Sequence, residues 1–188
     1  PPVDFERPVM YEGELQRAVF TTVRIAPDHL SGGRVYFCEH KTPHLVWQPQ
    51  WQRHANAALG LASFSIVVPA PAEEAPRYAR LLGCAAQPER DGAMALTLGR
   101  FRIVLCTLDS YRVRYGSLGC SASLVAAHGA APKRPAFMGS LSIRTSSLQA
   151  VLECLTQPEA ADVQWSRSAD RVTVSAASAG DCTIEFVE

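Results

Sequence analysis

The chain has 188 residues, of which 47% are hydrophobic and 19% charged, so it can build a packed core and is not a disordered chain. Its 18 basic and 18 acidic residues give a formal net charge of zero, which argues against nucleic acid as a partner. No apolar run approaches the roughly 18 residues that a membrane helix needs, so we expect no membrane partner either.

The N-terminal part of the chain predicts strands. AVFTTVRI (18–25) and RVYFCEH (34–40) are rich in β-branched and aromatic residues. The glycines of HLSGGRV predict a turn before the second of these strands. The chain opens with PPVDF, without a methionine or a leader, so we expect that its natural N-terminus is missing.

A stretch rich in histidine and tryptophan follows, FCEHKTPHLVWQPQWQRHAN (37–56). Its TP and QP pairs break any strand ladder, so the stretch predicts a crossing between two parts of the chain. We favour docking of Trp47 and Trp51 onto a core over the alternative, a tryptophan-lined ligand pocket. His54 and Asn56 could equally cap a turn or face such a cavity, and both alternatives stay open.

The rest of the chain predicts the same order of elements twice: one strand, one helix and three strands. The predicted helices are PAEEAPRYARLLG (71–83) and SSLQAVLECLTQP (146–158), each with an apolar stripe or a proper start and stop signal. The strands with a clear pattern are 63–68, 94–100, 102–108, 140–145, 162–168, 171–177 and 182–188, which include only two of the three closing strands of the first copy.

The two copies align by sequence as well as by order. SFSIVV superimposes on SLSIRT at an offset of 77 residues, and RVYFCEH (34–40) superimposes on RIVLCTL at an offset of 68. The alignment predicts five segments. They are 1–40, the closing strands of an incomplete βαβββ unit; 41–61, a crossing; 62–108, a βαβββ unit; 109–139, a linker with one more strand or turn; and 140–188, a second βαβββ unit.

This organisation resembles the vicinal oxygen chelate superfamily, which includes glyoxalase I, extradiol dioxygenases and bleomycin-resistance proteins. The resemblance to its glyoxalase-like domain proteins is close over 1–83, where the chain reads GGRVYFCEHKTPHLVWQPQWQRHANAALGLASFSIVV before its first helix. Over the rest of the chain, the resemblance is limited to the order of helices and strands. It implies an α+β fold, with paired βαβββ units that form a curved, half-open sheet around a cavity and a partial third unit at the N-terminus.

The resemblance also implies where metal ligands would lie: a His or Gln in the first strand of a unit and a Glu in its last strand. The repeat alignment puts Ser63, Ser140, Val104 and Glu185 at these positions. Only Glu185 fits, so we predict that the C-terminal pair of units binds no metal. For Glu185 itself, a solvated strand carboxylate is favoured over a residue that lines the cavity.

In the partial unit, Tyr36, Cys38 and His40 lie two residues apart and so point to one face of a strand. If that face lines a cavity, His40 could serve as a metal ligand or base, and Tyr36 as a ligand contact. The structural alternative for His40, a packed histidine bonded to a carbonyl, is slightly favoured.

Two functions therefore compete. The first is a small-molecule-binding protein without a metal in its C-terminal pair, as in bleomycin resistance, with Tyr36, Trp47, Trp51, His54 and Asn56 as ligand contacts. The alternative is a metal-dependent lyase, isomerase or dioxygenase acting on vicinal oxygens, with His40 and Glu185 as metal candidates; the cofactor is unknown, and a divalent metal stays open for the full-length protein. Six cysteines without a C-x-x-C pair predict free thiols and a cytoplasmic location. A homodimer is also left open.

Overall fold

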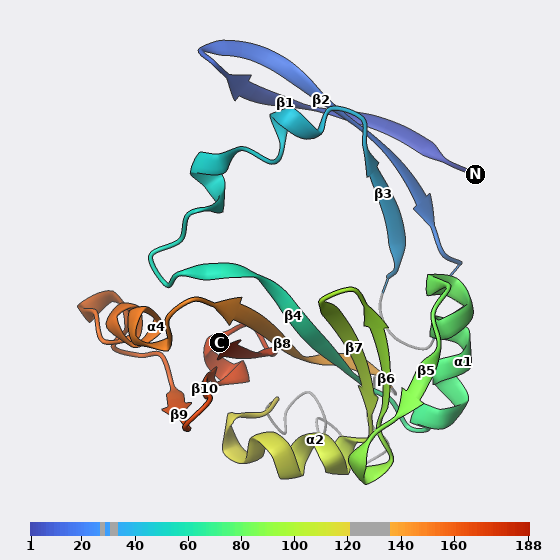
Figure 1. Ribbon diagram of the computed structural model, residues 1–188, viewed down its shortest axis with the longest axis vertical. Coiled ribbons are helices and arrows are strands. Elements are labelled where there is room, and N and C mark those ends of the chain that lie inside the picture. Colours follow the sequence, from blue (N-terminus) through green and yellow to red (C-terminus); the bar gives the residue numbers. More distant parts are fainter. Residues whose placement is uncertain (27–28, 31–33, 121–135) are drawn as a thin grey trace. The chain divides into compact units, whose positions relative to one another are not determined.

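The computed structural model describes residues 1–26, 29–30, 34–120 and 136–188 (Figure 1). Contacts divide the chain into two units, the first of Pro1–His29 and Arg34–His54, the second of Leu30–Gly33 and Ala55–Glu188. Within the described residues, no helix combines the length and the apolar character needed to span a membrane.

The first unit contains a three-stranded antiparallel sheet in the order β1-β2-β3. Its strands are β1 (Val3–Tyr11), β2 (Glu14–Arg24) and β3 (Tyr36–His40). The sequence predicted β2 and β3 but missed β1, whose polar residues dilute the strand pattern. The three closing strands of a βαβββ unit would form the same antiparallel order. The assignment of 1–40 to an incomplete unit stays a prediction.

The crossing contains two 3-10 turns, Pro43–Leu45 and Pro49–Gln52, and each begins at one of the prolines that the sequence predicted to break a strand. Leu45 is 3% exposed and Gln48 is 4% exposed, so these two residues fix the crossing. The prediction that both tryptophans dock onto a core is wrong, because Trp47 is 61% exposed and Trp51 is 50% exposed. A proline-started turn presents the large rings to solvent and the smaller Leu45 to the interior.

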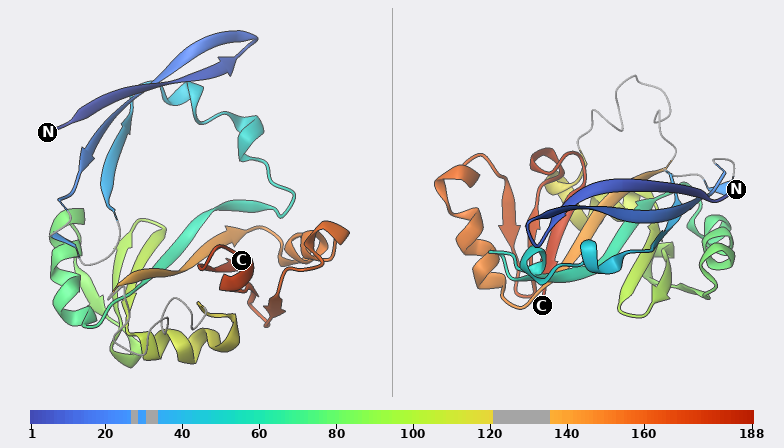
Figure 2. Two further views of the ribbon diagram at one scale, coloured as in Figure 1. Left: turned by 180° about the vertical axis from the view of Figure 1, so that it is seen from behind. Right: turned by 90° about the horizontal axis from the view of Figure 1, so that it is seen from above.

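The second unit is built on one eight-stranded sheet in the order β5-β6-β7-β4-β8-β11-β10-β9. Figure 2 shows the ribbon from two further directions. The strands in chain order are β4 (Ala58–Val67), β5 (Ala86–Pro88), β6 (Met94–Leu98), β7 (Phe101–Cys106), β8 (Phe137–Thr145), β9 (Trp165–Arg167), β10 (Arg171–Val174) and β11 (Thr183–Val187). The helices are α1 (Pro71–Leu82), α2 (Leu108–Tyr115) and α4 (Leu148–Leu155). The fold of this unit is therefore α+β, a curved, open sheet of two βαβββ units, as the sequence predicted.

The pairing of the strands repeats in both halves of this sheet. β4 runs parallel to β7, β8 runs parallel to β11, and β4 and β8 meet antiparallel at the centre. Phe64 pairs with Leu141, the residue that the offset of 77 assigns to it, so this pair lies on a pseudo-two-fold axis between the halves. Ser65 is opposite Val104 and Ser142 is opposite Glu185 in the parallel pairs, which reproduces the predicted match of the two last strands.

Both predicted helices form, and their ends follow the predicted signals. Gly83 ends α1 in the left-handed region at φ 65°, a conformation that glycine adopts without steric cost. Ser147 caps α4, where its side chain accepts a hydrogen bond from the N–H of Ala150 at 3.1 Å. α1 contacts β5, β6 and β7, and α4 contacts β10 and β11, so each helix covers its own half of the sheet.

The two faces of the sheet differ in polarity. Against α4 lies an apolar core of Leu148, Val151, Leu152, Val172, Val174 and Phe186. The other face also carries buried polar residues: Ser65, Ser140, Ser142, Thr173, Thr183 and Glu185. Buried polar groups require hydrogen-bond partners, and on this face several of them come from α2.

The structure corrects the prediction for the linker 109–139. Its first residues continue into α2, a helix, where the sequence predicted one more strand or turn. Thr107 caps this helix by accepting a hydrogen bond from the N–H of Ser110 at 3.1 Å, and the pattern of Tyr111 and Tyr115 one turn apart gives it an inner side. Residues 121–135 of the predicted linker lie outside the described part of the chain.

Candidate functional site: the polar face of the sheet and α2

Helix α2 binds to the polar face through two buried tyrosines. Tyr111 hydrogen-bonds to the carbonyl of Gly139 at 2.9 Å and to the hydroxyl of Thr183 at 2.7 Å, and it accepts from the N–H of Cys120 at 3.0 Å. The hydroxyl of Tyr115 donates to the hydroxyl of Ser140 at 3.0 Å. Burial raises the pKa of both tyrosines, so both phenols stay protonated near neutral pH.

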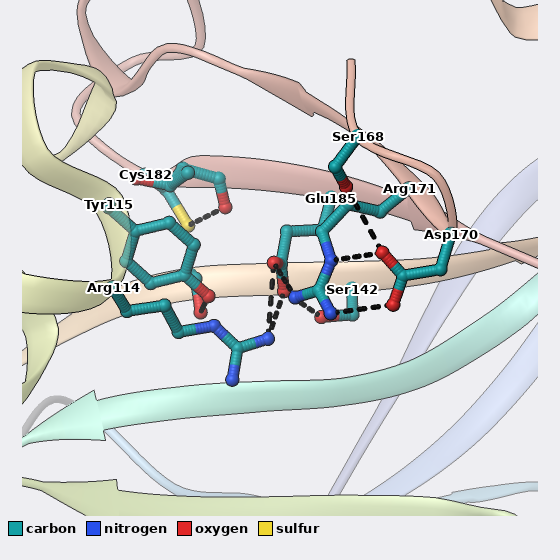
Figure 3. Close-up of polar contacts among 10 residues, drawn as sticks. Arg114, Tyr115, Ser142, Ser168, Asp170, Arg171, Cys182 and Glu185 are labelled. Atoms are coloured by element: carbon teal, nitrogen blue, oxygen red, sulfur yellow. Dashed lines mark hydrogen bonds and ion pairs between the residues drawn. The ribbon is translucent and has the colours of Figure 1, made fainter. Parts of the chain in front are cut away.

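Glu185 is a second link between α2 and the sheet (Figure 3). The carboxylate is 1% exposed and accepts from Ser142 at 2.8 Å, from Arg114 Nη2 at 3.1 and 3.0 Å, and from Arg171 Nη1 at 3.1 Å. Burial would raise the pKa of Glu185, but the charge of Arg114 and these hydrogen bonds hold the pKa below its usual value. Glu185 is therefore ionised and buried, which corrects the prediction of a solvated strand carboxylate.

Arg171 connects Glu185 to a further carboxylate. Its Nη2 lies 2.8 Å from Asp170, and its Nη1 bonds to Glu185. Hydrogen bonds from Arg171 and Ser168 lower the pKa of Asp170 to about 2. The result is a network of two arginines and two carboxylates at the edge of the polar face.

Two cavities flank the end of α2. The larger, of about 810 Å³, lies over the first half of the sheet and is lined by Ser65, Pro88, Glu89, Arg90, Asp91, Ala93, Val104, Cys106, Ser110, Tyr111, Val113, Arg114 and Tyr115. The smaller, of about 430 Å³, lies over the second half and includes Glu185 and Arg171. Arg114 and Tyr115 line both cavities, so the end of α2 separates them. The volume of the larger cavity is typical of small-molecule sites.

The floor of the larger cavity is chemically inert. Burial raises the pKa of the Cys106 thiol to about 11, so this cysteine is not a thiolate nucleophile at neutral pH. Val104 lies two residues before Cys106 on β7, and Ser65 pairs with Val104 from the neighbouring strand β4. These groups suit binding better than covalent chemistry.

The positions that the resemblance assigned to metal ligands hold a different arrangement. Ser140 is already bonded to Tyr115, and Ser63 pairs with Ser142 across the central strands. Both oxygens of Glu185 accept hydrogen bonds from arginine or serine, and a guanidinium occupies the place where a cation would approach. Across residues 1–26, 29–30, 34–120 and 136–188, no three or more His, Cys, Asp or Glu side chains gather as a metal site would require. These donors do not fit a divalent metal in the second unit.

The remaining predicted residues lie elsewhere. His40, in the first unit, stacks on Trp47 with ring centroids 5.5 Å apart and meets the edge of Phe20 at 5.0 Å. Its Nδ1 is buried and has no hydrogen-bond partner among the described residues. Tyr36 is 58% exposed at the other end of the same strand.

The last two candidates flank the boundary between the units. His54 is exposed at the end of the first unit. Asn56 begins the second unit, where its side chain accepts from the N–H of Ala58 at 3.3 Å and its carbonyl accepts from Thr145 at 2.9 Å. Asn56 thus takes the turn-capping alternative, and of the five predicted ligand contacts only Trp47 lies against another candidate, His40.

Sequence reasoning missed the residues that build the site in the second unit, above all Arg114, Tyr115, Ser142 and Arg171. The segment LDSYRVRYG carried a usable signal, because a threonine cap precedes it and two tyrosines follow one helical turn apart. Its charged residues and the glycines after it made the segment resemble a loop.

A family model of known proteins matches the N-terminal part of this chain. Residues 2–82 match the family model described as a glyoxalase-like domain, which confirms the resemblance predicted from the sequence. No curated protein matches the chain.

Solved structures give weaker similarities. A methylmalonyl-CoA epimerase from Mycobacterium tuberculosis is 21% identical with a TM-score of 0.45, over 72% of this chain and 95% of that chain. A hypothetical protein from Bacillus halodurans C-125 is 17% identical with a TM-score of 0.42, over 68% of this chain and 92% of that chain. A xylose isomerase-like TIM barrel/4-hydroxyphenylpyruvate dioxygenase fusion protein is 14% identical with a TM-score of 0.37, over 68% of this chain and 25% of that chain.

Proposed function

We propose that the second unit binds a small molecule, without a metal, in the cavity of about 810 Å³ beside α2. The observation that carries the proposal is the state of Glu185, the one residue that matches the metal-ligand pattern. Arg114 and Arg171 supply the positive charge that a metal would otherwise supply there. The cavity beside this group of ion pairs can hold a ligand. The tyrosine, valine and serine side chains that line the cavity offer both apolar contact and hydrogen bonds.

An alternative function rests on the first unit. A metal-dependent lyase, isomerase or dioxygenase would use His40, whose buried Nδ1 has no partner among the described residues. An imidazole nitrogen in this state is a suitable metal donor, but a metal also needs further ligands. His40 lies in the first unit and Glu185 in the second, so the alternative requires ligands from other parts of the protein.

The proposal also covers the cellular location and the oligomeric state of the protein. All six cysteines are free, which supports a cytoplasmic location, where thiols stay reduced. Besides the small-molecule ligand, we propose a second copy of the chain as a partner. Light scattering after size-exclusion chromatography would test whether the protein forms this homodimer.

Thermal-shift screening with a panel of aromatic and 2-oxo compounds tests the binding function. A ligand that binds only the folded protein at about 100 times its Kd stabilises it by about 2.7 kcal/mol, which raises Tm measurably. The variant Val104→Phe should abolish the shift, because Val104 lines the cavity. Leu59→Phe is the matched control, since Leu59 is 67% exposed and does not line it. No shift with any compound would count against binding, and a shift that survives Val104→Phe would place the ligand elsewhere.

A further inference from the structure

Toward the described residues, Arg114 uses only one of its terminal nitrogens. Both of its hydrogen bonds to described residues run from Nη2 to Glu185, at 3.1 and 3.0 Å. Figure 3 shows the other terminal nitrogen pointing away from Glu185. The Arg114 side chain is 51% exposed and lines the larger cavity, so its unused N–H groups are accessible from there.

Resting on the proposed binding function, we propose that Arg114 recognises the carboxylate of a small organic acid in this cavity. A guanidinium N–H donates a charge-assisted hydrogen bond to a carboxylate, and Nη1 of Arg114 has no such partner among the described residues. Valine side chains and tyrosine rings in the lining suit an acid with an apolar or aromatic body.

The surroundings hold the Arg114 guanidinium in place before a ligand arrives. Glu185 binds it on one side, and its Cζ lies 5.3 Å from the centroid of the Tyr115 ring. A side chain that is already ordered loses less conformational entropy on binding, so the interaction with the ligand is stronger.

The nearby charges also favour an anion beside Nη1 of Arg114. Glu185 is shared between Arg114 and Arg171, so two guanidiniums face one buried carboxylate. Asp170, which pairs with Arg171, has a side chain 67% exposed, and solvent screens its charge.

The other charged residues of the cavity do not replace Arg114. Glu89 is paired with Arg102, and Arg90 and Asp91 are neighbours of opposite charge. Arg114 is therefore the cation on the side of the cavity formed by α2.

The test compares phenylpyruvate with its uncharged methyl ester by isothermal titration calorimetry. We expect the wild-type protein to bind the acid at least about tenfold more tightly than the ester, as a charge-assisted hydrogen bond predicts. Arg114→Met should reduce this ratio to near one. Arg112→Met is the matched control, because Arg112 lies on the same helix, its side chain is 57% exposed and it does not line the cavity.

Arg114→Lys separates recognition from folding, since lysine can keep the ion pair with Glu185 but has no second terminal nitrogen to donate to a ligand. It should fold like the wild type and still lose the preference for the acid. Equal binding of acid and ester by the wild type, or a preference that both Arg114 variants retain, would overturn the role of Arg114 and leave the binding function standing. If other compounds of the panel bind but neither phenylpyruvate nor its methyl ester does, the role of Arg114 is overturned and the binding function stands. If no compound binds, both the role of Arg114 and the binding function are overturned.

Discussion

The ring of Tyr111 packs directly onto the backbone of Gly139, so closely that a Cβ at Gly139 would lie 2.7 Å from Tyr111 Cε2 and 3.0 Å from Val67 Cγ2. No side chain fits in this space. The contact brings α2 against the first residues of β8, where the Tyr111 hydroxyl reaches the Gly139 carbonyl.

Gly139→Ala should therefore destabilise the protein by about 1–3 kcal/mol, the usual range for overpacking a core. Urea denaturation followed by circular dichroism measures this change. In a Tyr111→Ala background, the two nearest contacts are removed and only the contact with Val67 remains, so Gly139→Ala should cost clearly less than in the wild type. Equal costs in the two backgrounds would show that the contact with Tyr111 is not the cause.

Glu185→Gln should lower the free energy of unfolding by about 1–3 kcal/mol at neutral pH, because it weakens hydrogen bonds to two charged donors. Arg114 and Arg171 are partly exposed and can be hydrated, which limits the loss. Glu159→Gln, at an exposed position, is the matched control and should change stability little.

The pH dependence of stability should also report on Glu185. Its pKa is lower in the folded protein than in the unfolded chain, so its stabilisation is present above the unfolded value of about 4.3 and is lost as the pH falls through the folded value. Denaturation curves from pH 7 downward should show this loss in the wild type, and Glu185→Gln should remove that part of it. An unchanged pH profile in the variant would contradict the assigned ion pairs.

The buried tyrosines should be visible in an alkaline titration. Burial raises the pKa values of Tyr78, Tyr111 and Tyr115 above the ordinary value of about 10, so these phenols ionise late. Stability is fully present below pH 10 and falls as the pH rises through the folded values. Ultraviolet absorbance of phenolate measures the steps, and Tyr111→Phe and Tyr115→Phe should each remove amplitude from the upper step. Loss from the lower step would mean that α2 is not docked.

The crossing should depend on Leu45 more than on its tryptophans. Leu45→Ala should cost about 2–5 kcal/mol as a buried leucine, whereas Trp47→Ala and Trp51→Ala should each cost about 1 kcal/mol or less, since both rings are largely exposed. Acrylamide quenching of tryptophan fluorescence in the folded protein provides an independent measure of exposure. Strongly protected fluorescence would contradict the exposed positions of both rings.

Metal analysis separates the two candidate functions. After dialysis of the purified full-length protein, we expect no stoichiometric divalent metal. A stoichiometric metal that is lost in His40→Ala and kept in His54→Ala would instead support the enzyme alternative.

The order of elements could be predicted because the signals for it are local. The capping Ser147, the closing Gly83 and the alternation of apolar residues in the strands act within a few neighbours. The offset of 77 residues between the halves reappears as the pairing of Phe64 with Leu141, because a repeated sequence pattern places the same face inward in both copies. β5, with three residues, is too short to give such a pattern.

The sequence by itself determined the α+β class, the two βαβββ units and the glyoxalase-like resemblance. Only the tertiary structure decided that the helix after β7 packs on the polar face, and that Arg114 binds Glu185 although 71 residues separate them in the chain. Local propensity cannot show such a contact, because the burial of Glu185 and its cationic neighbours arise from strands and a helix that meet only in the folded sheet.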